Sequence, residues 1–150
     1  MKKIITNSAK ETVFLGKRIS RLLQGQEIIG LFGELGSGKT TLAKGLAEGL
    51  GVKRAQVNSP SFILMRKYTG KLPLYHFDLY RIKDAQEICN IGYEEFVFAD
   101  GVSVIEWAEK MGALLPKDYL KIELVHIGGQ KRLIKLLAKG RRHRELLSRL

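Results

Sequence analysis

The sequence contains one cysteine, Cys89, among its 150 residues, which excludes an internal disulfide. Its three histidines are dispersed, so the pattern contains no cysteine–histidine cluster of the kind that holds zinc. We expect Cys89 to be a small buried residue rather than a reactive thiol. Long apolar runs are missing too: the first residues, MKKIITNSAKE, offer only the pair Ile4 and Ile5. We therefore expect neither a signal peptide nor a membrane span, and a cytoplasmic protein without a membrane partner.

Acidic residues are scarce, because 15 aspartates and glutamates face 26 lysines and arginines, giving a formal net charge of +11. The surplus gathers near the end of the sequence, where residues 131–150 carry eight basic residues and a single acid, Glu145. Such an imbalance predicts an anionic partner. Two interpretations fit this segment: a solvated basic face, or a surface that contacts nucleic acid or an acidic protein.

Apolar residues make up 45% of the chain, enough for one compact domain spanning residues 1–150. A capping box followed by helical spacing predicts a helix over residues 9–23. The run EIIGLF at 27–32 is typical of a buried parallel strand, and regularly spaced leucines predict a helix over 40–50. The stretch between these two elements is therefore a glycine-rich turn that joins a strand to a helix.

The second half of the sequence reads mainly as strands. FILMRKY and LPLYHFDLY flank a short turn and predict an antiparallel hairpin, as do LKIELVHI and RLIKLLA. A short irregular or helical part separates the first hairpin from the strand VSVIEW, and a basic helix is expected at about 140–150. One strand–turn–helix unit joined to hairpins predicts an α/β fold with a mixed parallel and antiparallel central sheet flanked by helices.

Residues 33–40, GELGSGKT, match the phosphate-binding pattern G-x-x-x-x-G-K-[ST] at each required position. Glycines let main-chain N–H groups converge on phosphate oxygens at the positive end of a helix. Lys39 would reach the β- and γ-phosphates, and the Thr40 hydroxyl would bind Mg²⁺. The pattern predicts a P-loop NTPase-like fold that binds a nucleoside triphosphate and Mg²⁺. The candidate nucleotide-binding residues here are Gly33, Glu34, Leu35, Gly36, Ser37, Gly38, Lys39, Thr40 and Thr41.

A phosphate site of this kind also needs an acid for the metal or the attacking water, usually at the end of a neighbouring strand. Asp78 interrupts the apolar strand LYHFDLY and shares a face with His76, while Glu106 ends VSVIEW. Burying a carboxylate without a partner destabilises the folded state by roughly several kcal/mol. A bound cation would therefore account for both Asp78 and Glu106. The alternatives are an Arg81 ion pair or a capping role for Asp78, and an exposed strand end for Glu106.

Three further features are ambiguous from the residues alone. The segment RAQVNSPSF at 54–62 follows the P-loop helix, where nucleotide switches place a γ-phosphate sensor, but an ordinary Ser-Pro turn fits equally well. Trp107 is either a packing aromatic or a stacking surface beside Glu106. No arginine finger is evident, because Arg66 and Arg81 lie on or beside the first hairpin and nothing in the sequence directs either side chain to the phosphate site.

The order of these motifs resembles one family, TsaE, formerly YjeE, the small bacterial ATPase of tRNA threonylcarbamoyladenosine biosynthesis. The matching segments are GELGSGKTTLAKGLAEGLG, NSPSFILMRKY, PLYHFDLYRI, IGYEEF and VSVIEWAEKMGALLP, in the right order over roughly residues 7–125. The resemblance implies an ATP-hydrolysing accessory protein that binds the TsaB–TsaD complex. In that family TsaD itself transfers threonylcarbamoyl to an adenosine beside the anticodon, so the resemblance implies that contact with tRNA is indirect, through the complex.

The resemblance also implies roles for single residues. Lys39 would contact phosphate, Thr40 and Glu106 would be Mg²⁺ ligands, and Asp78 would serve hydrolysis. The adenine would lie near Thr6 and Arg132. The family's switch-like loop is matched by Ser59, Pro60, Ser61 and Phe62, and many members have threonine in place of Ser61.

Two other functions share the P-loop. A small-molecule or nucleotide kinase would need an acceptor pocket and a closing lid, and the sequence has no insertion large enough for a lid. A non-hydrolytic nucleotide-dependent binding module would use ATP only to fix a surface. Without an evident arginine finger, the leading hypothesis is an ATPase that is slow alone and depends on its partner.

Overall fold

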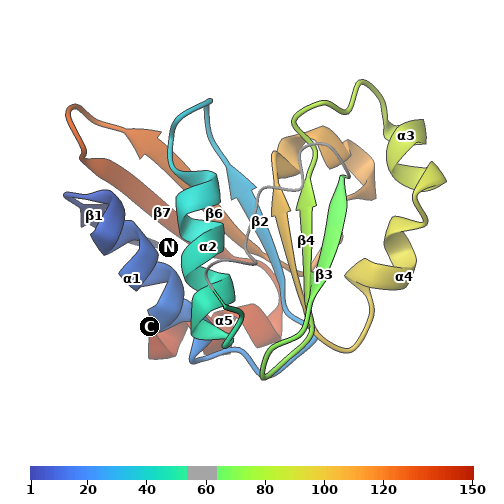
Figure 1. Ribbon diagram of the computed structural model, residues 1–150, viewed down its shortest axis with the longest axis horizontal. Helices are drawn as coiled ribbons and strands as arrows, with labels where there is room; N and C mark the ends of the chain where they lie inside the picture. The colour runs from blue at the N-terminus through green and yellow to red at the C-terminus, as the bar shows by residue number, and fades with distance from the viewer. Residues whose placement is uncertain (54–63) are drawn as a thin grey trace.

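The computed structural model describes residues 1–53 and 64–150, which fold into a set of strands and helices (Figure 1). The strands are β1 (Lys2–Thr6), β2 (Ile28–Phe32), β3 (Met65–Tyr68), β4 (Leu74–Asp78), β5 (Val102–Glu106), β6 (Leu120–His126) and β7 (Arg132–Ala138). The helices are α1 (Ala9–Ser20), α2 (Lys39–Gly49), α3 (Ala85–Asn90), α4 (Tyr93–Val97), the 3-10 helix η2 (Ala108–Leu114) and α5 (Arg141–Arg149).

The strands form one seven-stranded sheet in the order β1-β7-β6-β2-β5-β4-β3. β2 is parallel to both β5 and β6, and β4 is parallel to β5. The remaining pairs, β1–β7, β6–β7 and β3–β4, are antiparallel. The prediction of an α/β fold with a mixed sheet flanked by helices is therefore confirmed.

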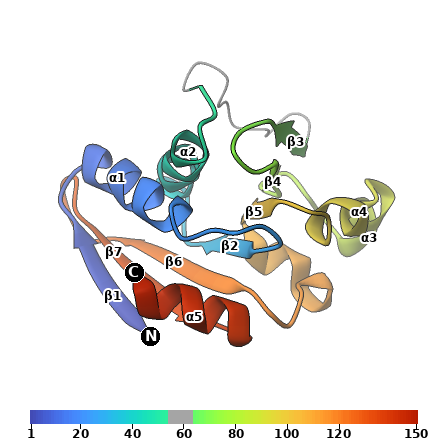
Figure 2. The same cartoon turned by 90° about the horizontal axis from the view of Figure 1, so that it is seen from below.

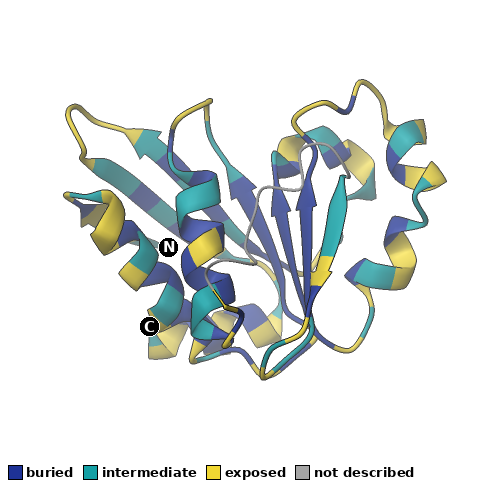
Figure 3. Cartoon of the chain, in the orientation of Figure 1, coloured by how far each residue is buried: buried dark blue, intermediate teal, exposed yellow. Residues whose placement is uncertain are grey.

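Helices cover the two faces of the sheet to different extents (Figure 2). α1 and α2 pack together on one face, and their leucines join inward residues of β2, β6 and β7 in one hydrophobic cluster. On the other face, α3, α4 and η2 contribute to a second cluster with β4 and β5. The strands β2, β4 and β5 contribute residues to both clusters. They are buried along most or all of their length (Figure 3).

Burial follows the sequence pattern strand by strand. β4 and β5 are buried at each of their five positions, as expected for parallel strands covered on both sides. β6 instead alternates between buried and partly exposed residues over most of its length, the pattern of an antiparallel strand with one solvated face. β2 is likewise buried over most of its length and lies between β6 and β5, so the buried strand predicted from the apolar run 27–32 is confirmed.

Four features differ from the sequence expectations. The first helix ends at Ser20, earlier than predicted, and η2 had not been predicted. β1 had not been predicted either, since five residues with a lysine pair give no clear pattern and their pairing partner, β7, lies at the other end of the chain. Cys89 is exposed on α3, so the expectation of a buried residue was wrong. Among the described residues, no helix is long and apolar enough to cross a membrane.

The basic end of the chain is built into the fold rather than left in solvent. His143, Leu146 and Leu147 of α5 are buried, and Arg142 donates a hydrogen bond of 2.6 Å to the Gly25 carbonyl. The Ile28 N–H, at the start of β2, donates to His143 Nε2 over 3.2 Å. The helix predicted at about 140–150 is confirmed, and part of its charge serves to anchor it.

A pH dependence of stability is expected from His143. Its burial lowers the pKa below the ordinary value of about 6.5, while the Lys139 carbonyl and the carboxylates of Glu27 and Asp118 oppose this shift. Between that ordinary pKa and the lowered one, His143 binds a proton in the unfolded chain but not in the folded chain. The stability contributed by His143 is therefore complete above about pH 6.5 and lost as the pH falls from there to the lowered pKa.

Urea unfolding measured between pH 5 and pH 7.5, roughly, checks this expectation. The free energy of unfolding of the unsubstituted chain should fall more steeply with decreasing pH than that of His143→Gln. Equal slopes for the two proteins would contradict the assignment.

Candidate active site

The glycine-rich loop, residues 33–38, connects the end of β2 to the start of α2. Two of its glycines are required by the backbone. Gly33 has φ 136°, and a Cβ there would lie 2.3 Å from the Leu124 carbonyl oxygen. Gly38, the N-cap of α2, has φ 106°, and a Cβ there would lie 2.6 Å from Arg132 Nε. These two glycines consequently add no side chain of their own beside the N–H groups at the helix N-terminus.

Lys39 is held inside this loop. Its ammonium donates to the carbonyl oxygens of Gly33 and Glu34 over 2.6 and 2.9 Å, and it lies 3.7 Å from the centre of the Trp107 ring. Burial lowers the pKa of Lys39 below its ordinary value, and the negative charge of Glu106 is the largest opposing influence. Trp107 therefore covers the cation of the loop, and it also packs against the second hydrophobic cluster, so its two interpretations are both still open.

Asp78 and Glu106 lie side by side, because they are partners in the parallel register at the carboxyl ends of β4 and β5. Glu106 is 1% exposed, so the alternative of an exposed strand end is wrong. One carboxylate oxygen, Oε2, accepts from the Thr40 hydroxyl over 2.7 Å, and the other, Oε1, lies 2.8 Å from His76 Nε2. The carboxylate is thus bound from both sides.

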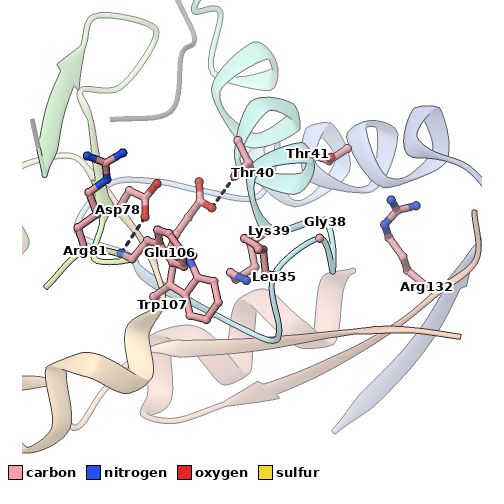
Figure 4. Close-up of a pocket in the computed structure, with 12 residues that line it drawn as sticks. Leu35, Gly38, Lys39, Thr40, Thr41, Asp78, Arg81, Glu106, Trp107 and Arg132 are labelled. Carbon is pink, nitrogen blue, oxygen red and sulfur yellow. Dashed lines mark hydrogen bonds between the residues drawn. The ribbon is translucent and has the colours of Figure 1, made fainter. Parts of the chain in front are cut away.

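Asp78 is 4% exposed and accepts a hydrogen bond of 3.0 Å from the Tyr80 N–H. This bond is the capping role that the sequence allowed as an alternative for Asp78. The aspartate nevertheless also reaches the candidate site, as Figure 4 shows, with its carboxylate on the same side as the Glu106 carboxylate and the Thr40 hydroxyl. A local turn therefore fixes a side chain that faces the cavity.

These side chains line a cavity of about 430 Å³ at the N-terminus of α2 (Figure 4). Elements from distant parts of the chain meet in its wall: the P-loop and α2, the ends of β4 and β5, and the start of β7. The lining residues are Leu35, Gly36, Gly38, Lys39, Thr40, Thr41, Asp78, Tyr80, Arg81, Glu106, Trp107 and Arg132.

Most of the residues proposed from the sequence meet here, and some do not. Gly33, Glu34 and Ser37 line a separate cavity between the loop and β6. Thr6 lines neither of these cavities: it is buried, shares a 2.8 Å hydrogen bond with Thr12, and pairs with Arg132 in the β1–β7 ladder. The proposed switch-like loop, Ser59, Pro60, Ser61 and Phe62, lies outside the described residues.

Sequence reasoning missed three residues near this site. Arg81, which had no clear aim in the sequence, lines the cavity because the chain turns directly after Asp78. Tyr80 lines it as well, with its ring centre 5.2 Å from that of Trp107. His76 binds Glu106 from behind. The shared face of His76 and Asp78 was the available signal, but only the fold shows that Glu106 is their common neighbour.

The oxygen atoms in the cavity suit Mg²⁺. The Thr40 hydroxyl and the Glu106 and Asp78 carboxylates are hard donors, which this ion prefers. Among the described residues, no group of three or more histidine, cysteine, aspartate or glutamate side chains could hold a metal ion. Mg²⁺ at nucleotide sites takes only one or two carboxylates and fills its shell with phosphates and water, so the donor set fits.

Comparisons with known proteins agree on one family. A family model described as "Threonylcarbamoyl adenosine biosynthesis protein TsaE" matches residues 6–134. The tRNA threonylcarbamoyladenosine biosynthesis protein TsaE of Bacillus subtilis is 38% identical over 97% of this chain and 90% of its own length. Its counterpart from Treponema pallidum is 40% identical over 80% of this chain and 88% of its own. The crystal structure of Bacillus subtilis YdiB superposes with a TM-score of 0.84 and 33% identity, covering 99% of this chain and 92% of that one.

Removing the Thr40 hydroxyl should expose the cost of leaving Glu106 under-satisfied. Thr40→Val keeps the shape of the side chain but deletes the donor to the buried carboxylate, so the free energy of unfolding should fall by about 1–3 kcal/mol. Thr41→Val, at the next position of α2, is the matched control and should change it by less than about 0.5 kcal/mol. Urea unfolding of both variants measures the difference, and equal losses would refute the importance of this bond.

Proposed function

Because this chain belongs to the TsaE family, we propose that it is an ATP-binding and ATP-hydrolysing accessory protein of tRNA threonylcarbamoyladenosine biosynthesis, acting on the TsaB–TsaD complex in the cytoplasm. The observation that carries the proposal is the cavity in which the P-loop lysine and hydroxyl meet two buried carboxylates. This combination of a phosphate cradle with acids at neighbouring strand ends is the equipment of P-loop hydrolases.

Phosphate binding is the task of the loop and its flanking cations. The N–H groups at the start of α2 carry partial positive charge and bind phosphate oxygens, and Lys39 adds a full charge beside them. Arg132 supports the loop by donating to the Ser37 carbonyl over 3.1 Å, and its side chain also lines the cavity. The nucleotide is thus bound mainly by main-chain groups that the glycines leave accessible.

The acids divide the remaining work. Thr40 and Glu106 would hold Mg²⁺, which would neutralise charge on the phosphates; the bond between the two side chains supports this pairing. Asp78, oriented by the Tyr80 N–H, holds a water for attack on the γ-phosphorus and accepts its proton as the bond to the β-phosphate oxygen breaks. The products are ADP and inorganic phosphate.

The rim of the cavity fits a protein partner. Leu35 in the loop is 73% exposed and Tyr80 is 44% exposed, so two large, mainly apolar side chains of the cavity wall face solvent. Exposed apolar residues that gather at one site are typical of a surface that another protein covers. This supports action on the TsaB–TsaD complex, with access to tRNA through that complex.

Two substitutions should separate binding from hydrolysis. Lys39→Met removes charged hydrogen bonds worth about 1.5–3 kcal/mol, so ATP affinity in calorimetry should fall by roughly 10- to 100-fold. Asp78→Asn should leave affinity within about threefold but lower turnover by roughly 100-fold or more, because it removes the proton acceptor. Lys44→Met, on the exposed side of α2, is the control and should change neither quantity. Full turnover in Asp78→Asn would contradict the role of the aspartate.

Partner dependence has its own test. ATP turnover should be slow for the chain alone and should rise by at least about tenfold, equivalent to about 1.4 kcal/mol of barrier, when purified TsaB–TsaD complex is added. Labelled γ-phosphate should appear as inorganic phosphate. Equal, fast rates with and without the complex would argue against partner dependence, label on a small acceptor would indicate a kinase, and binding without turnover would indicate a non-hydrolytic module.

A further inference from the structure

His76 has no place in the proposed reaction so far, yet it is buried beside the site. It lies in the middle of β4 and is 2% exposed. In the sheet it pairs with Val104 of β5, two residues before Glu106, and its Nε2 reaches Glu106 Oε1 over 2.8 Å. A polar ring at this depth in an apolar strand is costly unless its hydrogen bonds are made.

We propose that His76 is a positioning residue for the magnesium site: it fixes one oxygen of Glu106 so that the other faces Thr40 and the metal. The inference rests on the proposed function, because it assumes that Glu106 and Thr40 hold Mg²⁺. Its new content is that metal affinity depends on a histidine that does not itself touch metal or nucleotide.

The bonding pattern assigns a direction to this contact. An ionised carboxylate can only accept, so the Nε2 proton of His76 is donated to Oε1, while the Thr40 hydroxyl donates to Oε2. The last torsion of a glutamate is soft, and two donors on opposite oxygens remove that freedom. Glu106 is therefore pre-oriented, and little ordering is left for metal binding to impose.

Asp78 provides the internal contrast. It lies beside Glu106 in the register but is oriented by the Tyr80 N–H, a main-chain group of its own turn. The Glu106 carboxylate, in contrast, is bound by two side chains, those of His76 and Thr40. Among the described residues, no main-chain N–H donates to it. Loss of His76 should thus affect the metal-binding carboxylate and leave the phosphate cradle intact.

Calorimetry of ATP binding at a series of free Mg²⁺ concentrations, with EDTA as the metal-free limit, tests the proposal. For His76→Leu the Mg²⁺ concentration that gives half of the gain in ATP affinity should rise by about 10- to 100-fold, the usual effect of losing a partner of a metal ligand. Affinity in EDTA should stay within about twofold of the unsubstituted chain. His76→Gln, which keeps a donor, should recover part of the loss.

Variants at two positions keep the outcome unambiguous. If His76→Leu does not fold, His76→Asn gives the same test with a polar side chain too short to reach Glu106. His143→Asn is the matched control, because His143 is also 2% exposed and hydrogen-bonded. It belongs to α5 and contacts the first residue of β2, at the end opposite the phosphate-binding loop. This substitution should lower the melting temperature without moving the Mg²⁺ dependence.

The possible results separate the two proposals. An unchanged Mg²⁺ dependence in folded His76 variants, beside a clear dependence in the unsubstituted chain, would overturn the role of His76 alone. An unsubstituted chain that binds ATP without any effect of Mg²⁺ would overturn both this inference and the metal assignment. An equal shift in His143→Asn would show that the effect is one of general stability, and would also overturn the role of His76.

Discussion

A buried negative charge must be met by hydrogen-bond donors, and in this protein that requirement ties three elements to one point. Glu106 is almost fully buried at the end of β5, and its two oxygens are met by Thr40 from α2 and His76 from β4. Satisfying this carboxylate therefore fixes the first turn of the P-loop helix against the neighbouring strands. The register that sets Asp78 beside Glu106 then completes the wall of the cavity.

The loop itself is closed by a second charge, that of Lys39. Its ammonium binds loop carbonyls and lies against the Trp107 ring, so the cation joins the turn after β2 to the residue after β5. Trp107 has the left-handed backbone angle φ 59°, which is uncommon for a residue with a side chain. Its ring also contacts the Tyr80 ring in a tilted arrangement, and Lys110 donates to the Tyr80 and Ile82 carbonyls. The segment after Asp78 and the segment after Glu106 thus support one another.

The end of the molecule away from the cavity has a structural role that its composition hides. The basic segment looked from its charge like a surface for an anionic partner, but α5 uses Arg142 and His143 to hold the start of β2 and the turn before it. Arg18 of α1 in turn binds the carbonyl of Leu150. β2 is therefore held at its first residue by α5, while its last residue delivers the phosphate-binding loop.

Local sequence determined those parts whose physics is local. The glycines at 33 and 38, the lysine and the threonine specified a strand–turn–helix cradle, since backbone geometry and helix polarity act within a few residues. The hairpins and the central strands followed from alternation and from apolar runs for the same reason. The order of the strands, the pairing of β1 with β7, the solvent exposure of Cys89 and the approach of Arg81 to the cavity were decided by tertiary structure. So was the bond between His76 and Glu106, thirty residues apart, because hydrogen bonding across a sheet depends on register, and register is set by the packing of the whole chain.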